Sequence, residues 1–134
     1  YVKQQRQLMN SCITKLTRQY NNRDLKLRLR AYTDISSLKT LLEKSLTQKT
    51  RIHVIGNQVL FEKNLSIYWD YFLKRSQQIS KRPKFKQSNH PINLIIFGDK
   101  IVFVNLVDNF QLFGFKNKQV AQIYKKIWNN YSNN

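Results

Sequence analysis

The chain has 134 residues, of which 41% are hydrophobic and 13% aromatic, and this content predicts one packed domain and excludes a disordered tail. Lys and Arg outnumber Asp and Glu by 24 to 7, a formal net charge of +17, and the single Cys12 excludes an internal disulfide and a multi-cysteine zinc site. No apolar run reaches the ~20 residues of a membrane span and the first residues lack a signal-peptide core, so we expect a soluble, intracellular protein of the cytoplasm or nucleoid.

The first predicted element is an amphipathic helix over residues 2–20. Lysines and arginines occupy its other faces, and its apolar side chains recur at intervals of three and four residues: Leu8, Met9, Cys12, Ile13, Leu16 and Tyr20. We assign residues 1–22 to this helix, as a linker or as a dimerisation element that joins two copies, and residues 23–134 to an α/β domain. Packing of the helix on its own domain is an equally good alternative.

A strand, a helix and a second strand are predicted next. In "LKLRLR" (25–30) leucines alternate with basic residues, which is the period of a strand with one buried and one basic face. Asp34 can cap the helix that follows and continues to about Gln48, and "RIHVI" (51–55) is a short β-branched strand that ends at Gly56. This order predicts a right-handed crossover between two parallel, paired strands.

The second half is predicted to be mainly antiparallel. Residues 63–79 form an aromatic-rich helix, whose aromatic stripe we assign to the core in preference to base stacking. The segment "KRPKFKQSNHP" (81–91) is a basic loop with two prolines. Tight Gly-Asp and Asp-Asn turns then force antiparallel pairing of three strands, at 93–97, 101–107 and 110–115. An amphipathic helix from Val120 to Tyr131 closes the chain.

The hairpin "NLIIFGDKIVFVN" (93–105), with His90 just before it, resembles the hairpin on which phospholipase-D-like phosphodiesterases carry their catalytic residues. Such enzymes need a histidine nucleophile, a lysine two residues later and a carboxylate five residues after that. Counting from His90 places Ile92 and Phe97 at the lysine and carboxylate positions. This register therefore lacks two of the three groups.

A second register, aligned on the strand and its turn, is no better. It places Pro91, Asn93 and Gly98 at the histidine, lysine and carboxylate positions. His53 lies inside an apolar strand, where a buried neutral imidazole is the expected state. A nuclease half-site completed by a second copy is the rival hypothesis, and it requires the missing lysine and carboxylate.

Other catalytic and ligand-binding motifs are missing from the sequence. It has no GxxxxGK[ST], GxGxxG, HExxH or CxxC pattern. Glu62 and Asp70 are eight residues apart and are explained most simply as solvated surface. We therefore expect no enzymatic activity, no cofactor and no bound metal.

The candidate site is a group of basic residues in and before the loop at 81–91. The group contains no acid and one interleaved aromatic residue, and its members are Lys74, Arg75, Lys81, Arg82, Lys84, Phe85 and Lys86. A flexible basic loop with one aromatic can neutralise several phosphates and stack on an unpaired base. The charge makes nucleic acid the first partner to consider, an anionic membrane the second and an acidic protein the third. We predict nucleic acid as the partner, with DNA favoured over RNA, and we expect no membrane binding. The alternative is a solvated loop in a lysine-rich chain.

Three stretches, "LKLRLRAYTDISSLKTLLEKSL", "TRIHVIGN" and "NLIIFGDKIVFVNLVDNFQLFGFKNKQVAQIYKKIWNNY", together resemble the C-terminal domain of the TrmB-like transcriptional regulators. Gly98, Asp99 and Lys100 fill the turn of that family's hairpin, and Trp128 lies near the end of the closing helix. The resemblance implies a phospholipase-D-like fold that has lost its catalytic residues and keeps the hairpin as scaffold. The family has a further strand before the hairpin, where we expect only the basic loop.

We therefore predict an α/β domain with a small mixed sheet flanked by helices, phospholipase-D-like, with an N-terminal amphipathic helix. Its predicted function is that of a non-catalytic, basic, nucleic-acid-associated domain, the regulatory and dimerisation part of a TrmB-like transcription regulator. The alternative is a structural RNA- or protein-binding subunit of a large ribonucleoprotein or polymerase assembly.

Overall fold

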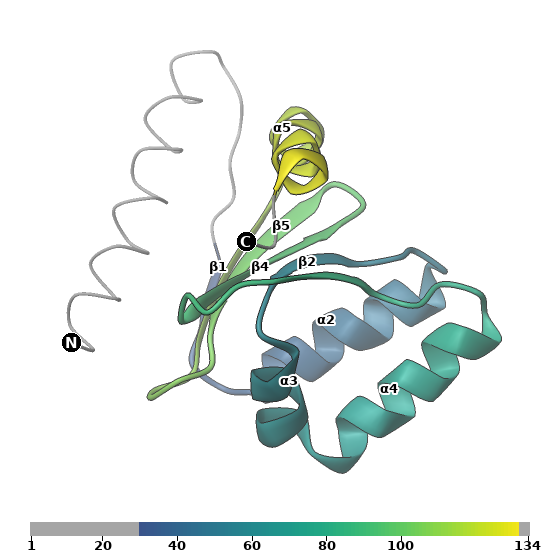
Figure 1. The fold of residues 1–134 in the computed structure, drawn as a ribbon, viewed down its shortest axis with the longest axis vertical. Helices are drawn as coiled ribbons and strands as arrows, with labels where there is room; N and C mark the ends of the chain where they lie inside the picture. Colours follow the sequence, from purple (N-terminus) through teal and green to yellow (C-terminus); the bar gives the residue numbers. More distant parts are fainter. Residues whose placement is uncertain (1–29, 132–134) are drawn as a thin grey trace.

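Two layers of helices enclose a six-stranded mixed sheet in the computed structural model, which describes residues 30–131 (Figure 1). The strands are β1 (Arg30–Tyr32), β2 (His53–Gly56), β3 (Lys84–Gln87), β4 (Ile92–Phe97), β5 (Lys100–Asn105) and β6 (Gln111–Lys116). The helices are α2 (Ser36–Thr47), α3 (Gln58–Leu65), α4 (Ile67–Gln78) and α5 (Lys118–Asn130). The predicted mixed sheet flanked by helices is confirmed. The predicted N-terminal helix and all but the last residue of the strand predicted at 25–30 lie outside the described residues.

The strand order across the sheet is β1-β6-β5-β4-β2-β3, and every neighbouring pair is antiparallel except β2 and β3. The antiparallel pairing predicted for β4, β5 and β6 is confirmed. The β4–β5 turn contains Gly98 at φ 56, a conformation that glycine adopts without steric cost. Within the described residues, no helix is both long enough and apolar enough to cross a membrane.

The predicted pairing of the first two strands is wrong. The strand before α2 pairs with β6, at one edge of the sheet, and β2 pairs with β4 and β3 near the other edge. The β4, β5 and β6 strands therefore lie between the two strands that were expected to be neighbours. Two short connections, residues 98–99 and 106–110, keep those three strands together, so β1 and β2 join the sheet on opposite sides of this meander.

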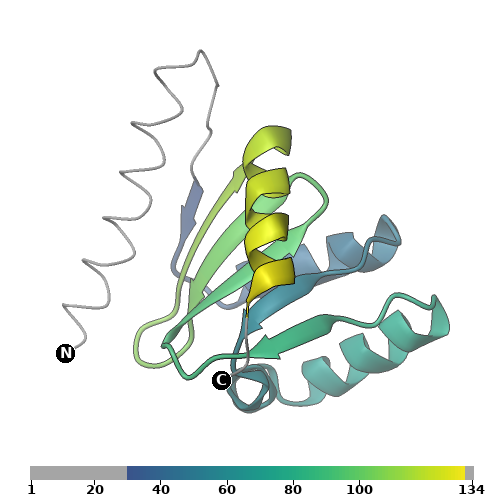
Figure 2. The same ribbon diagram turned by 45° about the horizontal axis from the view of Figure 1, so that its top comes forward.

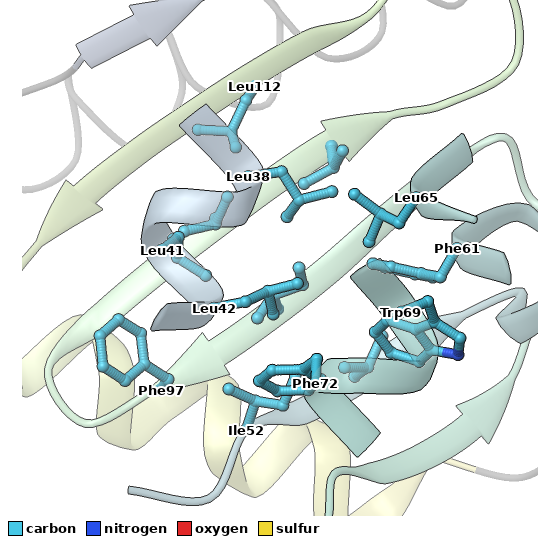
Figure 3. Packing of buried hydrophobic residues seen from close by; sticks show 14 of the residues in the cluster. Leu38, Leu41, Leu42, Ile52, Phe61, Leu65, Trp69, Phe72, Phe97 and Leu112 are labelled. Atoms are coloured by element: carbon cyan, nitrogen blue, oxygen red, sulfur yellow. The ribbon is translucent and has the colours of Figure 1, made fainter. Parts of the chain in front are cut away.

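One face of the sheet is covered by α2, α3 and α4, and most of the core lies there (Figures 1 and 3). The aromatic stripe is core, as predicted: Phe61, Trp69 and Phe72 are fully buried and pack on one another. However, the single helix predicted at 63–79 is two helices. The chain breaks at Ser66, which has φ 51, because this change of direction lets α3 and α4 each turn an apolar side to the sheet.

The loop predicted at 81–91 is also wrong in part, because it contains the edge strand β3, which pairs with β2 in parallel. In the sequence of β3, basic residues alternate with an aromatic residue. Lys84 and Lys86 point to one face of the sheet, and Phe85 points to the other, where it contacts Phe61 and Trp69. The two flanking prolines and the three polar residues of this strand had suggested a loop, and its partner β2 is distant in sequence.

Among residues 30–131, α5 is the helix that covers the other face of the sheet, and it crosses β5, β4 and β2 (Figure 2). A second, smaller apolar cluster lies beneath it and contains Ile101, Phe115, Val120 and Ala121. The helix begins at a favourable cap, because the Asn117 side chain accepts a hydrogen bond from the Val120 amide at 3.0 Å.

A buried asparagine joins the start of β4 to the end of β2. The Oδ1 atom of Asn93 accepts a hydrogen bond from the Asn57 amide at 2.9 Å, and its Nδ2 atom donates to the Val104 carbonyl at 3.4 Å. Asn57 in turn caps α3 by accepting from the Val59 amide at 3.0 Å. Gly56 makes this approach feasible, because a Cβ atom there would overlap the Asn93 side-chain oxygen.

The Gly56→Ala variant should lose about 1–3 kcal/mol of unfolding free energy, because the added methyl group overpacks a buried hydrogen-bonded site. The matched control is Gly114→Ala, whose Cβ atom would come no closer than 3.5 Å to its nearest neighbour. Urea denaturation measures both variants. In an Asn93→Ala background the penalty for Gly56→Ala should shrink, and an unchanged penalty would contradict the assigned contact.

Candidate nucleic-acid interface

Basic side chains gather where the edge strand β3 meets the start of β2 and the helix α5. His53 opens β2 and lies directly opposite Lys84 in the register of the parallel pair. Arg51, two residues before it, donates a hydrogen bond to the Ser80 carbonyl at 3.1 Å and so ties the segment that follows α4 to the start of β2. Lys81, Arg82, Lys84 and Lys125 are exposed.

The His53 imidazole reports on this concentration of charge. Burial of the ring is the largest cause that lowers its pKa, and repulsion by cations adds to it. Together they lower the pKa from 6.5 to about 4. The cations concerned are Lys125, Lys84 and Arg51. We call Arg51, Lys81, Arg82, Lys84 and Lys125 the basic edge.

Carboxylates are kept away from this surface. The sequence contains no Asp or Glu from Tyr71 to Gly98 and none after Asp108. Within residues 30–131, the helices that carry acidic residues are α2, α3 and α4, and these lie on the opposite face of the sheet from α5 (Figure 1). The basic edge can therefore attract an anion without competition from carboxylates of these helices.

The residues predicted as the site do not all reach this surface. Lys81, Arg82 and Lys84 do, and they are exposed. Lys74 and Arg75 are exposed on α4, and Arg75 donates to the Gln78 side chain at 3.3 Å. Their role in binding nucleic acid stays a prediction.

Phe85 and Lys86 are placed differently from the prediction. The Phe85 ring lies edge-on to Phe61 and Trp69, with centroids 5.6 and 5.8 Å away, so it belongs to the core and is not presented to a base. The Lys86 ammonium donates to the carbonyls of Trp128, Asn129 and Tyr131 at 2.6, 3.2 and 3.2 Å. Its charge therefore stabilises the end of α5.

Trp128 completes this attachment of α5. The Lys86 Nζ atom lies 4.2 Å from the centroid of the indole ring, and the ring meets the His53 imidazole edge-on at 4.8 Å. The indole N–H donates to the Val54 carbonyl at 3.1 Å. One aromatic side chain thus connects the last turn of α5 to β2 and to β3.

Arg51 and Lys125 were missed from sequence. Arg51 begins the apolar stretch "RIHVIG" and Lys125 lies in the helical "YKKIW", so neither adjoins the basic loop. The alternation of Lys, Phe, Lys and Gln at 84–87 could have indicated a strand. It could also have indicated that Lys84 and Lys86 lie on the same face of that strand. Nothing in the sequence indicated that β3 and the start of β2 lie close to α5.

The two histidines lie too far apart to form a pair. His53 is opposite Ile96 in the antiparallel β2–β4 register, whereas His90 precedes the first residue of β4. The Nδ1 atom of His90 accepts a hydrogen bond from the Ile92 amide at 3.1 Å, which shapes the turn into β4. Within residues 30–131, no group of three His, Cys, Asp or Glu side chains is placed to hold a metal ion.

No known family model and no curated protein matches this sequence. Among solved structures, the chain is similar to TrmBL2, described as an archaeal chromatin protein that shows a novel mode of DNA binding. The sequence identity is 13% and the TM-score is 0.42, over 97% of this chain and 62% of that one. The chain thus spans less than two thirds of the TrmBL2 chain.

Replacing Lys86 by Met should lower the free energy of unfolding by about 1–3 kcal/mol, because the last carbonyls of α5 lose a charged donor while the apolar stem is kept. Lys84→Met removes the same charge from the neighbouring exposed position and should stay within about 0.5 kcal/mol of the parent. Chemical denaturation with tryptophan fluorescence measures both. Equal destabilisation by the two changes would contradict the assigned role of Lys86.

Stability should fall as the pH drops from 6.5 to about 4. In this range the unfolded chain protonates His53 and the folded chain does not, so protons favour unfolding. The shift corresponds to at most ~3 kcal/mol, and solvent screening of a half-buried ring reduces this to about 1 kcal/mol. Thermal denaturation across this range should show the decrease in the parent and not in His53→Gln. If the stability of the parent and of His53→Gln changed identically with pH, the predicted contribution of His53 would be contradicted.

Proposed function

We propose that this domain is a non-catalytic, nucleic-acid-associated module that binds the phosphates of DNA through the basic edge. The observation that carries the proposal is the gathering of cations from β3, α5, the residues just before β2 and the segment after α4 at one edge of the sheet. Such a surface gains affinity from the release of counterions and reads little sequence. Among the described residues, the carboxylates of α2, α3 and α4 lie across the sheet, so the exposed ammonium and guanidinium groups can meet phosphate oxygens.

The lack of catalysis is part of the same proposal, and Asn93 supports it. In the alignment on the strand and its turn, Asn93 stands at the position where phospholipase-D-like enzymes have lysine, and Gly98 where they have a carboxylate. The Asn93 amide is fully buried and holds the Asn57 backbone. An amide committed to the backbone cannot hold a substrate phosphate.

The finer identity is proposed on the resemblance of the sequence alone. It is that of a phospholipase-D-like scaffold acting as the regulatory and dimerisation part of a TrmB-like transcription regulator. The strand β3 lies before the hairpin, where we expected only the basic loop, and we propose that it takes the place of the family's further strand. TrmBL2 is described as a DNA-binding chromatin protein; the proposal for this chain rests on its own charges.

Exposed apolar side chains favour a second candidate function, that of a subunit in a larger assembly. Ile123 and Ile127 are 42% and 47% exposed, one turn apart on α5, and with Tyr131 they line a shallow hollow. Such a stripe on a surface helix is typical of contact with another protein. A DNA-binding measurement separates the two functions, because a subunit that contacts only protein leaves a DNA probe unbound.

The test is fluorescence anisotropy of a labelled DNA duplex against the full chain over a range of salt concentrations. One variant changes four exposed cations of the basic edge to Gln: Lys81, Arg82, Lys84 and Lys125. The matched control changes four exposed cations elsewhere: Lys49, Lys63, Lys118 and Lys126. The edge variant should reduce the slope of log K against log salt by about 0.9 for each phosphate that it no longer neutralises. Equal reductions in both variants would reject the assigned surface.

A titration of His53 by NMR locates the DNA independently. Phosphates at the basic edge offset the repulsion from Lys125, Lys84 and Arg51, so binding should raise the pKa of His53. A bound duplex that leaves the His53 pKa unchanged contradicts the proposed site.

A further inference from the structure

A hollow of about 600 Å³ lies between α2 and the half of the sheet formed by β1, β6 and β5. Its apolar lining includes Leu41, Val102, Leu112 and Gly114. Figure 3 shows Leu41 and Leu112 on the side of the main core away from Phe61 and Trp69. Of the helices in the described part of the chain, α2 contributes to the lining, and α3 and α4 do not.

One part of the wall of the hollow is Gly114, which has no side chain to fill it. The register aligns Val54, Ile95, Val102 and Gly114 in one row across four strands, and the first three are buried. A Cβ atom at Gly114 would meet Val102 Cγ2 at 3.5 Å, which is ordinary van der Waals contact. The backbone therefore does not require glycine. A glycine inside a strand weakens it, and one reason for its presence is that a ligand or another backbone approaches closely there.

Three lysines stand at one end of this hollow. Lys44, Lys100 and Lys116 line both it and an adjoining hollow of about 320 Å³ beside the β4–β5 turn. Lys44 and Lys116 are exposed, and the Lys100 Nζ atom lies 5.2 Å from the centroid of the Phe97 ring. The second hollow also contains Asp99 in its lining. Three ammonium groups against one carboxylate leave a surplus of positive charge that suits a phosphate.

Hydroxyl groups line the wall on α2. Ser37 Oγ donates to the Asp34 carbonyl at 2.7 Å and Thr40 Oγ1 to the Ser36 carbonyl at 3.0 Å. Their protons are used, so their oxygen lone pairs are available to accept hydrogen bonds from a ligand. Tyr32, 40% exposed on β1, adds an aromatic ring to the lining.

We propose that this hollow binds a mononucleotide. Its phosphate is held by Lys44, Lys100 and Lys116, and its base lies on the strip of bare backbone at Gly114, with Tyr32 beside it. Amino groups of the base and hydroxyls of the ribose donate to the α2 hydroxyl oxygens. The volume is within the ~300–1,000 Å³ range of small-molecule sites. This site shares no residue with the basic edge, so it is independent of the proposed DNA binding.

Calorimetry with the full chain tests the site, with AMP, CMP, adenosine, ribose 5-phosphate and inorganic phosphate as probes. A mononucleotide should bind, and the other three probes should bind at least about tenfold more weakly, because adenosine lacks the phosphate and ribose 5-phosphate and inorganic phosphate lack the base. Binding of adenosine or inorganic phosphate as tight as that of AMP and CMP would overturn the proposal. So would the lack of any mononucleotide binding at millimolar concentration.

Variants then assign the site. The double change of Lys44 and Lys116 to Gln should weaken mononucleotide binding at least about tenfold, and the matched double change of Lys63 and Lys118 should not. Gly114→Val should abolish binding by filling the chamber, and Gly114→Ala should weaken it in a chain that remains folded. Binding that survives both Gly114 variants would overturn the proposal, whatever the result with DNA.

Discussion

The ammonium group of Lys86 decides how the C-terminal helix sits on the sheet. The last carbonyls of a helix lack intrahelical partners and carry the negative end of its dipole. Lys86 reaches them from the edge strand β3, and Trp128 connects the same turn to the Val54 carbonyl of β2. The positions of β3 and of α5 therefore depend on each other. The exposed cations beside them take their places from this attachment.

This attachment also separates two kinds of basic residue. Lys86 has its charge satisfied within the molecule, whereas its neighbour Lys84 is exposed and faces other cations. Cations held close to one another repel, and after burial, which is the main cause, this repulsion lowers the pKa of His53 further. Such an arrangement is tolerated at a surface because water screens it, and it becomes favourable when a polyanion arrives. The same charges spread over separate faces of the molecule would increase its solubility but would not form a binding surface for a polyanion.

The two ends of the sheet serve different purposes. At the end of β2, the side-chain oxygen of Asn93 accepts a hydrogen bond from the amide of Asn57, the residue that caps α3. At the opposite end, beside the β4–β5 turn, glycine in place of a larger side chain leaves the sheet open under α2. Both features come from single residues on central strands, where a side chain faces the helices and cannot avoid affecting their packing.

Much of the fold followed from local patterns in the sequence. The tight turns at Gly98 and Asp108 determined the antiparallel meander, because so few residues cannot connect strands in any other way. The aromatic stripe of Trp69 and Phe72 identified a core face, and the period of α5 identified the closing helix. The charge of the chain, and with it the class of partner, also came from composition. These are properties that a segment possesses before it meets the rest of the chain.

Tertiary structure alone decided the rest, because it depends on contacts between distant segments. The strand at Lys84–Gln87 exists only because β2 offers it hydrogen-bond partners, and its short polar sequence does not announce that. The same pairing turns Phe85 into the core and brings Lys86 to α5, which removed two residues from the predicted site. Arg51 and Lys125 joined it because β2 and α5 meet beside β3. Sequence by itself determined how much positive charge the protein carries; folding determined which of those charges face solvent together, since that depends on which strands pair.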